Sequence, residues 1–171
     1  MRDLIRSVAL ENGPTEGLAR VNTDQLLAAN VNPVTRLATD YLNLFNEAVM
    51  LFEMAIDMPD MAEELTEWHR RDYPTHFESS GFELRHVVIE AYESADPAIR
   101  EAFDASCESA LEAFERSIHK ILTSNLEDPA VCEDLRYDLS VMKALVMEMD
   151  SHIHGRPITK AVEQSDVDAM F

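Results

Sequence analysis

Glycine is scarce in this sequence, with only 4 among 171 residues. A phosphate-binding loop needs several closely spaced glycines, so that the backbone can approach the phosphate, and no such cluster is present. The Gly-x-Ser-x-Gly motif of serine hydrolases is also missing, and neither cysteine is next to a plausible base. These absences argue against nucleotide binding through a glycine-rich loop and against nucleophilic catalysis.

Long apolar stretches are lacking as well. The longest apolar run covers residues 48–52, whereas a membrane-spanning helix needs about 20 such residues. Asp3, Arg6 and Glu11 interrupt the N-terminal segment, which therefore has no apolar core of the kind found in a signal peptide. We expect a cytoplasmic protein with no membrane partner.

Cysteine is limited to Cys107 and Cys132. Each lies on the apolar side of a predicted helix, so we expect two buried thiols that behave as small apolar side chains. Free thiols are typical of proteins from a reducing compartment. The cysteines therefore agree with a cytoplasmic location.

Basic residues are strongly outnumbered. The chain has 14 Lys and Arg against 33 Asp and Glu, which gives a formal net charge of −19. Nucleic-acid affinity comes largely from Lys and Arg contacts to phosphate, and anionic membranes attract basic segments. We therefore expect no nucleic-acid partner. Solubility alone is a sufficient reason for the acidity, so the charge does not identify a basic partner.

Residues that favour helix are abundant. Ala, Leu, Glu and Met are plentiful, and β-branched residues do not dominate. An N-capping residue precedes a proline at 32–33, 96–97 and 128–129, and such a proline is tolerated in the first helical turn. Thr75 followed by Glu78 matches a capping box. These signals predict helices at 33–57, 59–71, 75–94, 97–124 and 129–153, with weaker ones at 2–10 and 23–30.

The short connections between these helices favour antiparallel neighbours. We therefore predict an all-α fold, an up-and-down antiparallel bundle of four long helices with one or two short accessory helices. Residues 1–22 are expected to form an N-terminal segment and loop, residues 23–154 the bundle domain, and residues 155–171 a C-terminal tail.

Two adjacent apolar stripes follow the predicted helix 33–57, one from Leu37 to Ala55 and one from Ala38 to Ile56. A helix that is apolar over so wide an arc is central in its own bundle, or it also faces another subunit. We predict a homodimer that uses part of this helix. In the alternative, the short helices at 2–10 and 59–71 cover the second stripe.

Metal binding is one candidate function. Glu83 and His86 form the single Glu-x-x-His on a predicted helix, a tetrapeptide that resembles the motif of ferritin-like metal–carboxylate bundles. That resemblance implies iron, manganese or zinc, with Glu47, Glu115 and His152 as further ligands from other helices. The motif occurs once and faces away from the apolar stripe, so the alternative is a solvated charged surface and no cofactor.

A second candidate site is the aromatic and basic cluster Trp68, Arg70 and Arg71. It lies at the end of a short predicted helix, where the two arginines could anchor an anionic partner. In the alternative, Trp68 belongs to the core and the arginines pair with the acidic residues of 63–67.

The tail offers a third candidate. Residues 164–171 place Val167, Met170 and Phe171 among aspartates, and one helical turn would bring these apolar residues together, as in a peptide that docks into a groove. The segment looks like the short acidic–apolar peptide by which flagellar switch proteins bind their response regulator. This resemblance implies a signalling adaptor. In the alternative, the tail is frayed or folds back onto its own bundle.

No complete catalytic set emerges from the sequence. We therefore hypothesise a non-enzymatic helical-bundle protein that acts through protein–protein interaction or self-association. The metal–carboxylate bundle and the signalling adaptor are the alternative functions.

Overall fold

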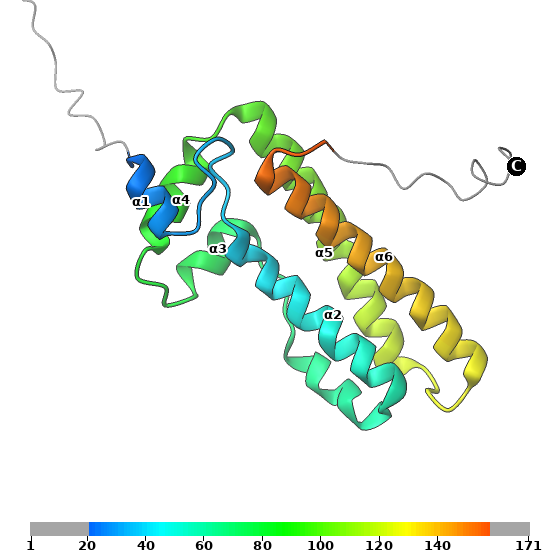
Figure 1. Ribbon diagram of the computed structural model, residues 1–171. Coiled ribbons are helices and arrows are strands. Elements are labelled where there is room, and N and C mark those ends of the chain that lie inside the picture. The colour runs from blue at the N-terminus through cyan, green and yellow to red at the C-terminus, as the bar shows by residue number, and fades with distance from the viewer. Residues whose placement is uncertain (1–20, 158–171) are drawn as a thin grey trace, which may run out of the picture.

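A computed structural model describes residues 21–157 of the chain (Figure 1). The predicted helix at 2–10 and the tail residues Val167, Met170 and Phe171 lie outside the described residues, so those predictions are not tested.

The all-α prediction is confirmed for the described residues. They form helices and, apart from one isolated β-bridge between Val31 and Ala38, no β-structure. None of the helices between residues 21 and 157 combines the length and the apolar character that crossing a bilayer requires.

Three long helices lie alongside one another and form what we call the three-helix end: α2 (Leu42–Asp57), α5 (Pro97–Thr123) and α6 (Pro129–His154) (Figure 1). The 3₁₀ helix η2 (Pro59–Glu67) packs against α2 and α5, and α6 packs against α5 and α2. The five residues between α5 and α6 make these two helices antiparallel neighbours. Three long helices are thus present where we predicted four, because the stretch predicted as a long helix at 75–94 forms two short helices, and η2 corresponds to the predicted short helix 59–71.

The two longest helices begin where the sequence predicts. The Asp96 carboxylate accepts a hydrogen bond from Ala98 N at 2.9 Å, and the Asp128 carboxylate accepts one from Ala130 N at 2.9 Å. Each aspartate thereby satisfies a backbone N–H that has no partner inside the helix. Helix α6 ends at His154, and the following Gly155 has a φ of 64°, the left-handed conformation that terminates many helices.

The prediction of one helix at 75–94 is wrong. Two short helices occupy this stretch, α3 (Tyr73–Glu78) and α4 (Arg85–Glu93). Ser80 Oγ donates a hydrogen bond to Phe77 O at 2.8 Å, which occupies a carbonyl that a continuing helix would use. Gly81 follows with a φ of 64°, which no helical residue adopts.

The predicted capping box at Thr75 is also wrong. Helix α3 begins two residues earlier, and its N-cap is Asp72, whose carboxylate accepts a hydrogen bond from Thr75 N at 2.9 Å. The signal is the same one found at the long helices, an aspartate ahead of an early proline, here Pro74.

Helix α2 begins later than the prediction of 33–57. The Asn32 side chain accepts hydrogen bonds from Val34 N and Thr35 N, but it caps a single turn, because Arg36 then takes a left-handed φ of 64°. A short 3₁₀ helix, η1 (Thr39–Tyr41), leads into α2. Similarly, the predicted helix 59–71 is the 3₁₀ helix η2, which ends at Glu67.

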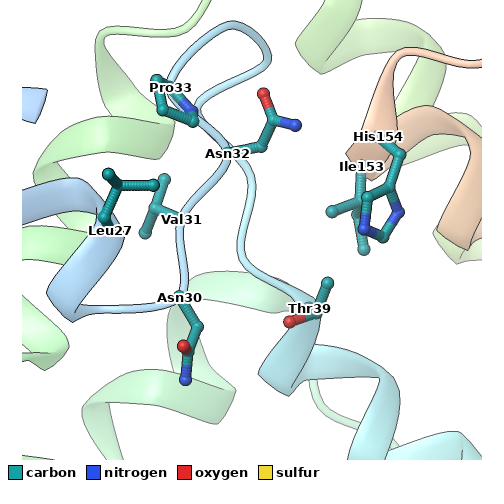
Figure 2. Close-up of a pocket in the computed structure, with 8 residues that line it drawn as sticks. All are labelled: Leu27, Asn30, Val31, Asn32, Pro33, Thr39, Ile153 and His154. Atoms are coloured by element: carbon teal, nitrogen blue, oxygen red, sulfur yellow. The ribbon is translucent and has the colours of Figure 1, made fainter.

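The helices α1 (Thr23–Ala28), α3 and α4 gather with η1 at the other end of the molecule, which we call the aromatic end (Figure 1). A shallow hollow of about 310 Å³ lies where the loop after α1 faces the end of α6 (Figure 2). Two of its polar groups are already engaged, since Asn30 donates to Asp40 and His154 Nδ1 contacts Asp150 O within α6.

Both apolar stripes of α2 are covered inside the chain. The side chains of Phe45, Ala48, Phe52 and Ala55 are fully buried, and Leu44 and Ile56 nearly so. They pack against η2, α5 and α6. The dimer stays a prediction, but the uncovered stripe from which we inferred it is not found.

Candidate functional site

Residues 68–72 form an irregular link between η2 and α3, and this link contains the predicted aromatic and basic cluster. Trp68 Nε1 donates a hydrogen bond to Leu44 O at 2.8 Å, and the Tyr41 hydroxyl donates one to Arg71 O at 2.7 Å. The indole ring also packs against Phe114, with ring centroids 5.9 Å apart. The link is thus held against α2 and α5 by side chains instead of by helical hydrogen bonds.

Arg70 joins the link to α5 through two carboxylates. Its Nη2 lies 2.6 Å from Glu108 Oε1 and its Nη1 lies 2.9 Å from Glu115 Oε2. These partners replace the acidic residues of 63–67 that the sequence had offered. The hydrogen bond to Glu108, together with Glu115, raises the pKa of the guanidinium. Because all three groups are largely exposed, the pairs orient Arg70 more than they stabilise the fold.

A groove of about 490 Å³ lies between η2 and α5. Its apolar lining is Leu65, Trp68, Ile118 and Leu122, and its polar lining is Thr66, His69, Arg70, Glu115 and His119. Leu122 remains 39% exposed, and Trp68 is half-buried. An apolar floor with polar groups around it is the composition of a surface that binds an amphipathic protein segment.

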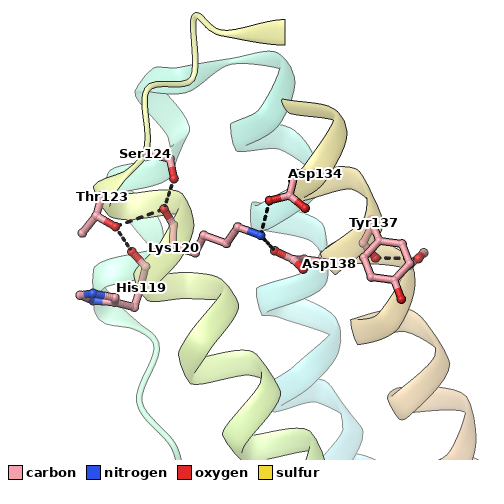
Figure 3. A network of polar contacts seen from close by, with 8 residues as sticks. His119, Lys120, Thr123, Ser124, Asp134, Tyr137 and Asp138 are labelled. Carbon is pink, nitrogen blue, oxygen red and sulfur yellow. Dashed lines mark hydrogen bonds and ion pairs between the residues drawn. The ribbon is translucent and has the colours of Figure 1, made fainter. Parts of the chain in front are cut away.

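The polar groups next to this groove fasten α5 to α6. Lys120 Nζ lies 2.6 Å from both Asp134 Oδ2 and Asp138 Oδ2 (Figure 3). The hydrogen bonds to Asp134 and Asp138 raise the pKa of Lys120. Lys120 is thus engaged in holding the helical hairpin, and it does not line the groove, whereas its neighbour His119 does.

A second hollow, the tyrosine pocket, has a volume of about 260 Å³. Its floor is buried and consists of Tyr41, Tyr73, Cys107 and Leu111; its more exposed rim consists of Asp72, Pro74, Tyr92, Asp104 and Glu108. Glu108 lines this pocket and Glu115 lines the groove, so Arg70 bonds to one residue of each.

Burial dominates the electrostatics of the tyrosine pocket. The Tyr92 hydroxyl donates to both carboxylate oxygens of Asp104 at 2.9 Å. Burial nevertheless raises the pKa of Asp104, against the lowering effects of Tyr92 and Arg100. Burial also raises the pKa of the Cys107 thiol far above neutrality. The shift favours the protonated thiol, which is the less nucleophilic form.

Comparison with protein-family models, with curated proteins and with solved structures found no match.

The predicted metal ligands are not brought together. Glu83 lies in the loop before α4 and His86 in its first turn, so the break in 75–94 removes the motif from a continuous helix. Glu47 is exposed on α2, Glu115 bonds to Arg70, and His152 lies at the end of α6. Over residues 21–157, no three His, Cys, Asp or Glu side chains are placed to hold one metal ion.

The sequence did not indicate the tyrosine pocket. Its lining comes from η1, the 68–72 link, α3, α4 and α5, so no local motif marks it. The best available signal is the position of Tyr92 and Asp104 on either side of the Asp96–Pro97 helix start, since the Tyr92 hydroxyl reaches Asp104 across this short connection.

Proposed function

We propose that the protein acts by binding a protein segment in the groove beside Trp68, without catalysing a reaction. The observation that carries this proposal is the apolar lining of the groove, with Leu122 left partly exposed next to a half-buried Trp68. Exposed apolar patches rimmed by polar residues mark interaction sites, and Trp and Arg are the residues that most often dominate binding energy.

The chemistry of the groove favours an apolar and acidic segment. Arg70 and Glu115 neutralise each other, and the other two ionisable side chains are His69 and His119, which supply N–H donors to carboxylates. The groove is thus free of the excess negative charge that characterises the chain as a whole, at −19. An acidic segment meets less repulsion here than over the rest of an acidic surface.

The chain itself contains a segment of this kind. Residues 164–171 combine Asp166 and Asp168 with Val167, Met170 and Phe171. We therefore propose that the groove binds this segment from a second copy of the chain. Self-association is then the function that connects the groove with the tail.

Trp68 provides a direct test, because it is the single tryptophan of the chain. A peptide of residues 160–171 contains neither Trp nor Tyr, so it can be titrated into protein lacking residues 164–171 while indole fluorescence is followed. We expect a saturable change in emission. A peptide in which Val167, Met170 and Phe171 are replaced by serine should give none.

A matched pair of protein variants localises the binding. Leu122→Glu places a charge in the groove and should abolish the response to the peptide. Val141→Glu changes a side chain of similar exposure on α6, 37% against 39%, outside the groove and should leave the response intact. A wild-type protein that does not respond to millimolar peptide, or two variants that respond equally, would reject the proposal.

A further inference from the structure

We propose that residues 2–10 bind as an amphipathic helix over the hollow beside Leu27, where the loop after α1 faces the end of α6 (Figure 2). The occupant of the hollow is then a segment of the same chain. This inference does not depend on the groove beside Trp68.

The hollow combines a buried apolar floor with exposed apolar side chains. Leu27 and Val31 lie on one side of it and Ile153 lies on the other (Figure 2). Val31 and Ile153 are buried, but Leu27 is 57% exposed, and Val34, next to the lining residue Pro33, is 81% exposed. No other Leu, Ile or Val side chain in the described part of the chain is as exposed as these two. Apolar surface at and next to the hollow is thus left for a partner to cover.

The sequence of residues 2–10 has the pattern of a helix that covers such a surface. With about 3.6 residues per turn, four apolar side chains fall on one face of this helix: Leu4, Ile5, Val8 and Ala9. Arg2 and Arg6 border one edge of that face, and Asp3 lies on the opposite side. An amphipathic helix binds a groove through such an apolar face. The segment is not needed at α2, because η2, α5 and α6 pack against that helix.

The hollow lies within reach of this segment. The described part of the chain begins at Val21, and Leu27 follows in α1, about 6 Å along the helix from Thr23. Residues 11–20 connect the segment to Val21, and ten residues of flexible chain span about 17 Å on average. A linker that matches the span gives an effective concentration in the millimolar range. The segment of the same chain therefore has the advantage over a second copy.

Two carboxylates without a basic partner lie beside the hollow. Asp24 precedes Leu27 by three residues and therefore lies on the same side of α1. The Asp40 carboxylate accepts a hydrogen bond at 3.4 Å from Asn30, which lines the hollow. Within residues 21–157, neither Asp24 nor Asp40 forms an ion pair with a lysine or arginine.

The arginines of the segment carry the charge that these carboxylates lack. Residues 2–10 contain Arg2 and Arg6 against the single acidic Asp3, so the segment is basic in a chain whose net charge is −19. The two arginines stand one helical turn apart at the edge of the apolar face, so they reach the rim when that face covers the floor. Opposite charges at a rim favour the correct partner and fix its orientation. The acidic residues 164–171 lack this complementarity.

The experiment measures nuclear Overhauser effects (NOEs) between methyl groups of the full chain, labelled at its Ile, Leu and Val methyls. NOEs arise only between groups that are close in space. We expect them between methyl groups of the segment and of the hollow, namely from Leu4, Ile5 and Val8 to Leu27 and Val31.

Two pairs of matched variants locate the contact. Leu27→Gln should abolish the NOEs from the segment to Val31, whereas Met50→Gln changes a side chain of similar exposure on α2, 54% against 57%, and should leave them intact. Both side chains are exposed, so either variant should fold. Replacing Arg2 and Arg6 by glutamate should also abolish the NOEs, and replacing both by lysine should preserve them, because lysine keeps the charge.

A mixture of two differently labelled chains identifies the occupant of the hollow. NOEs within one chain support the proposal. NOEs found only between differently labelled chains would assign the hollow to a second copy and overturn it. It would equally be overturned if the methyl groups of the segment showed no NOE to the hollow, or if the Leu27 and Met50 variants behaved alike.

Discussion

The two ends of the molecule are held together by different kinds of interaction. At the three-helix end, long helices satisfy their own backbone and the core is apolar, with Phe45, Phe52 and Phe114 fully buried. At the aromatic end the helices are short, and the chain between them lacks a regular hydrogen-bond partner. Side chains supply it, as when the Tyr73 hydroxyl accepts from Ala38 N at 2.8 Å.

Hydrogen bonds from side-chain hydroxyls to backbone groups also occur at other places where irregular backbone meets the rest of the molecule. Thr35 Oγ1 donates to Ile153 O at 2.5 Å, and the Tyr41 hydroxyl donates to Arg71 O. Buried backbone N–H and C=O groups need hydrogen-bond partners, so polar side chains are buried next to irregular segments. This explains why the tyrosine pocket lies at the aromatic end: hydroxyls are buried there to hold loops, and hollows form where loops meet helices.

The largest effect should come from the three-helix end. Phe114 packs edge-on against Phe45, with centroids 5.1 Å apart, and also contacts Trp68. We expect Phe114→Ala to lower the free energy of unfolding by about 3–5 kcal/mol and Leu44→Ala by about 2–5 kcal/mol, as large-to-small core changes do. Urea denaturation measures both. A loss below about 1 kcal/mol would mean that this core is not tightly packed.

At the aromatic end, removing a single hydroxyl group should lower the free energy of unfolding. Tyr73→Phe keeps the ring but leaves Ala38 N without its acceptor, so we expect a loss of about 1–3 kcal/mol. Tyr137→Phe is the matched control, because Tyr137 is 68% exposed on α6 and should change stability by less than about 0.5 kcal/mol. Equal losses of stability in the two variants would mean that a buried hydroxyl does not hold the backbone at the aromatic end.

The same contrast decides how much of the fold could be predicted from the sequence. Helices α5 and α6 follow from local signals, an aspartate and a proline at the start and a glycine after α6, so their bounds were predicted within one residue. Asn32 and Pro33 show the same start signal, but Arg36 breaks the turn. Arg36 is left-handed, and the neighbouring Thr35 donates a hydrogen bond to Ile153 O of α6, a contact that no local pattern reveals.

The candidate site beside Trp68 also contains parts that could be predicted from the sequence and parts that could not. The cluster at Trp68 and Arg70 was visible because its members are adjacent in the sequence. Its acidic partners, Glu108 and Glu115, were not, because they lie 38 and 45 residues further along the chain. The nearer acidic residues at 63–67 offered a simpler pairing, and only the path of the link across α5 excludes it.

His76 should make the stability of the protein depend on pH through a residue of the aromatic end. Its ring packs edge-on against Tyr41 and Phe77, and its Nδ1 is buried without a partner among the described residues. Burial, with the nearby Arg71 charge, lowers the pKa of His76. The unfolded chain therefore takes up this proton at a higher pH than the folded chain does, and stability falls as the pH drops below about 6.5.

Substituting His76 separates its contribution from the loss of stability that other ionisable groups cause at low pH. His76→Phe should remove a slope of at most about 1.4 kcal/mol per pH unit between the folded pKa and about 6.5. Leu44→Ala, at the three-helix end, should lie below the wild-type curve but parallel to it. Stability curves of His76→Phe and wild type that stay parallel from pH 7 to pH 5 would refute the assignment.

The smallest effect is expected at His86, although it also lies at the aromatic end. Its side chain is exposed in the first turn of α4, away from the buried Val87 and Val88. We expect His86→Ala to change the free energy of unfolding by less than about 0.5 kcal/mol, with or without added iron, manganese or zinc. What distinguishes the aromatic end is its buried hydroxyls and its half-buried imidazole, so an exposed imidazole there should behave like any surface residue. A large loss that metal restores would instead support the metal–carboxylate alternative, because only a ligand role couples an exposed histidine to stability in that way.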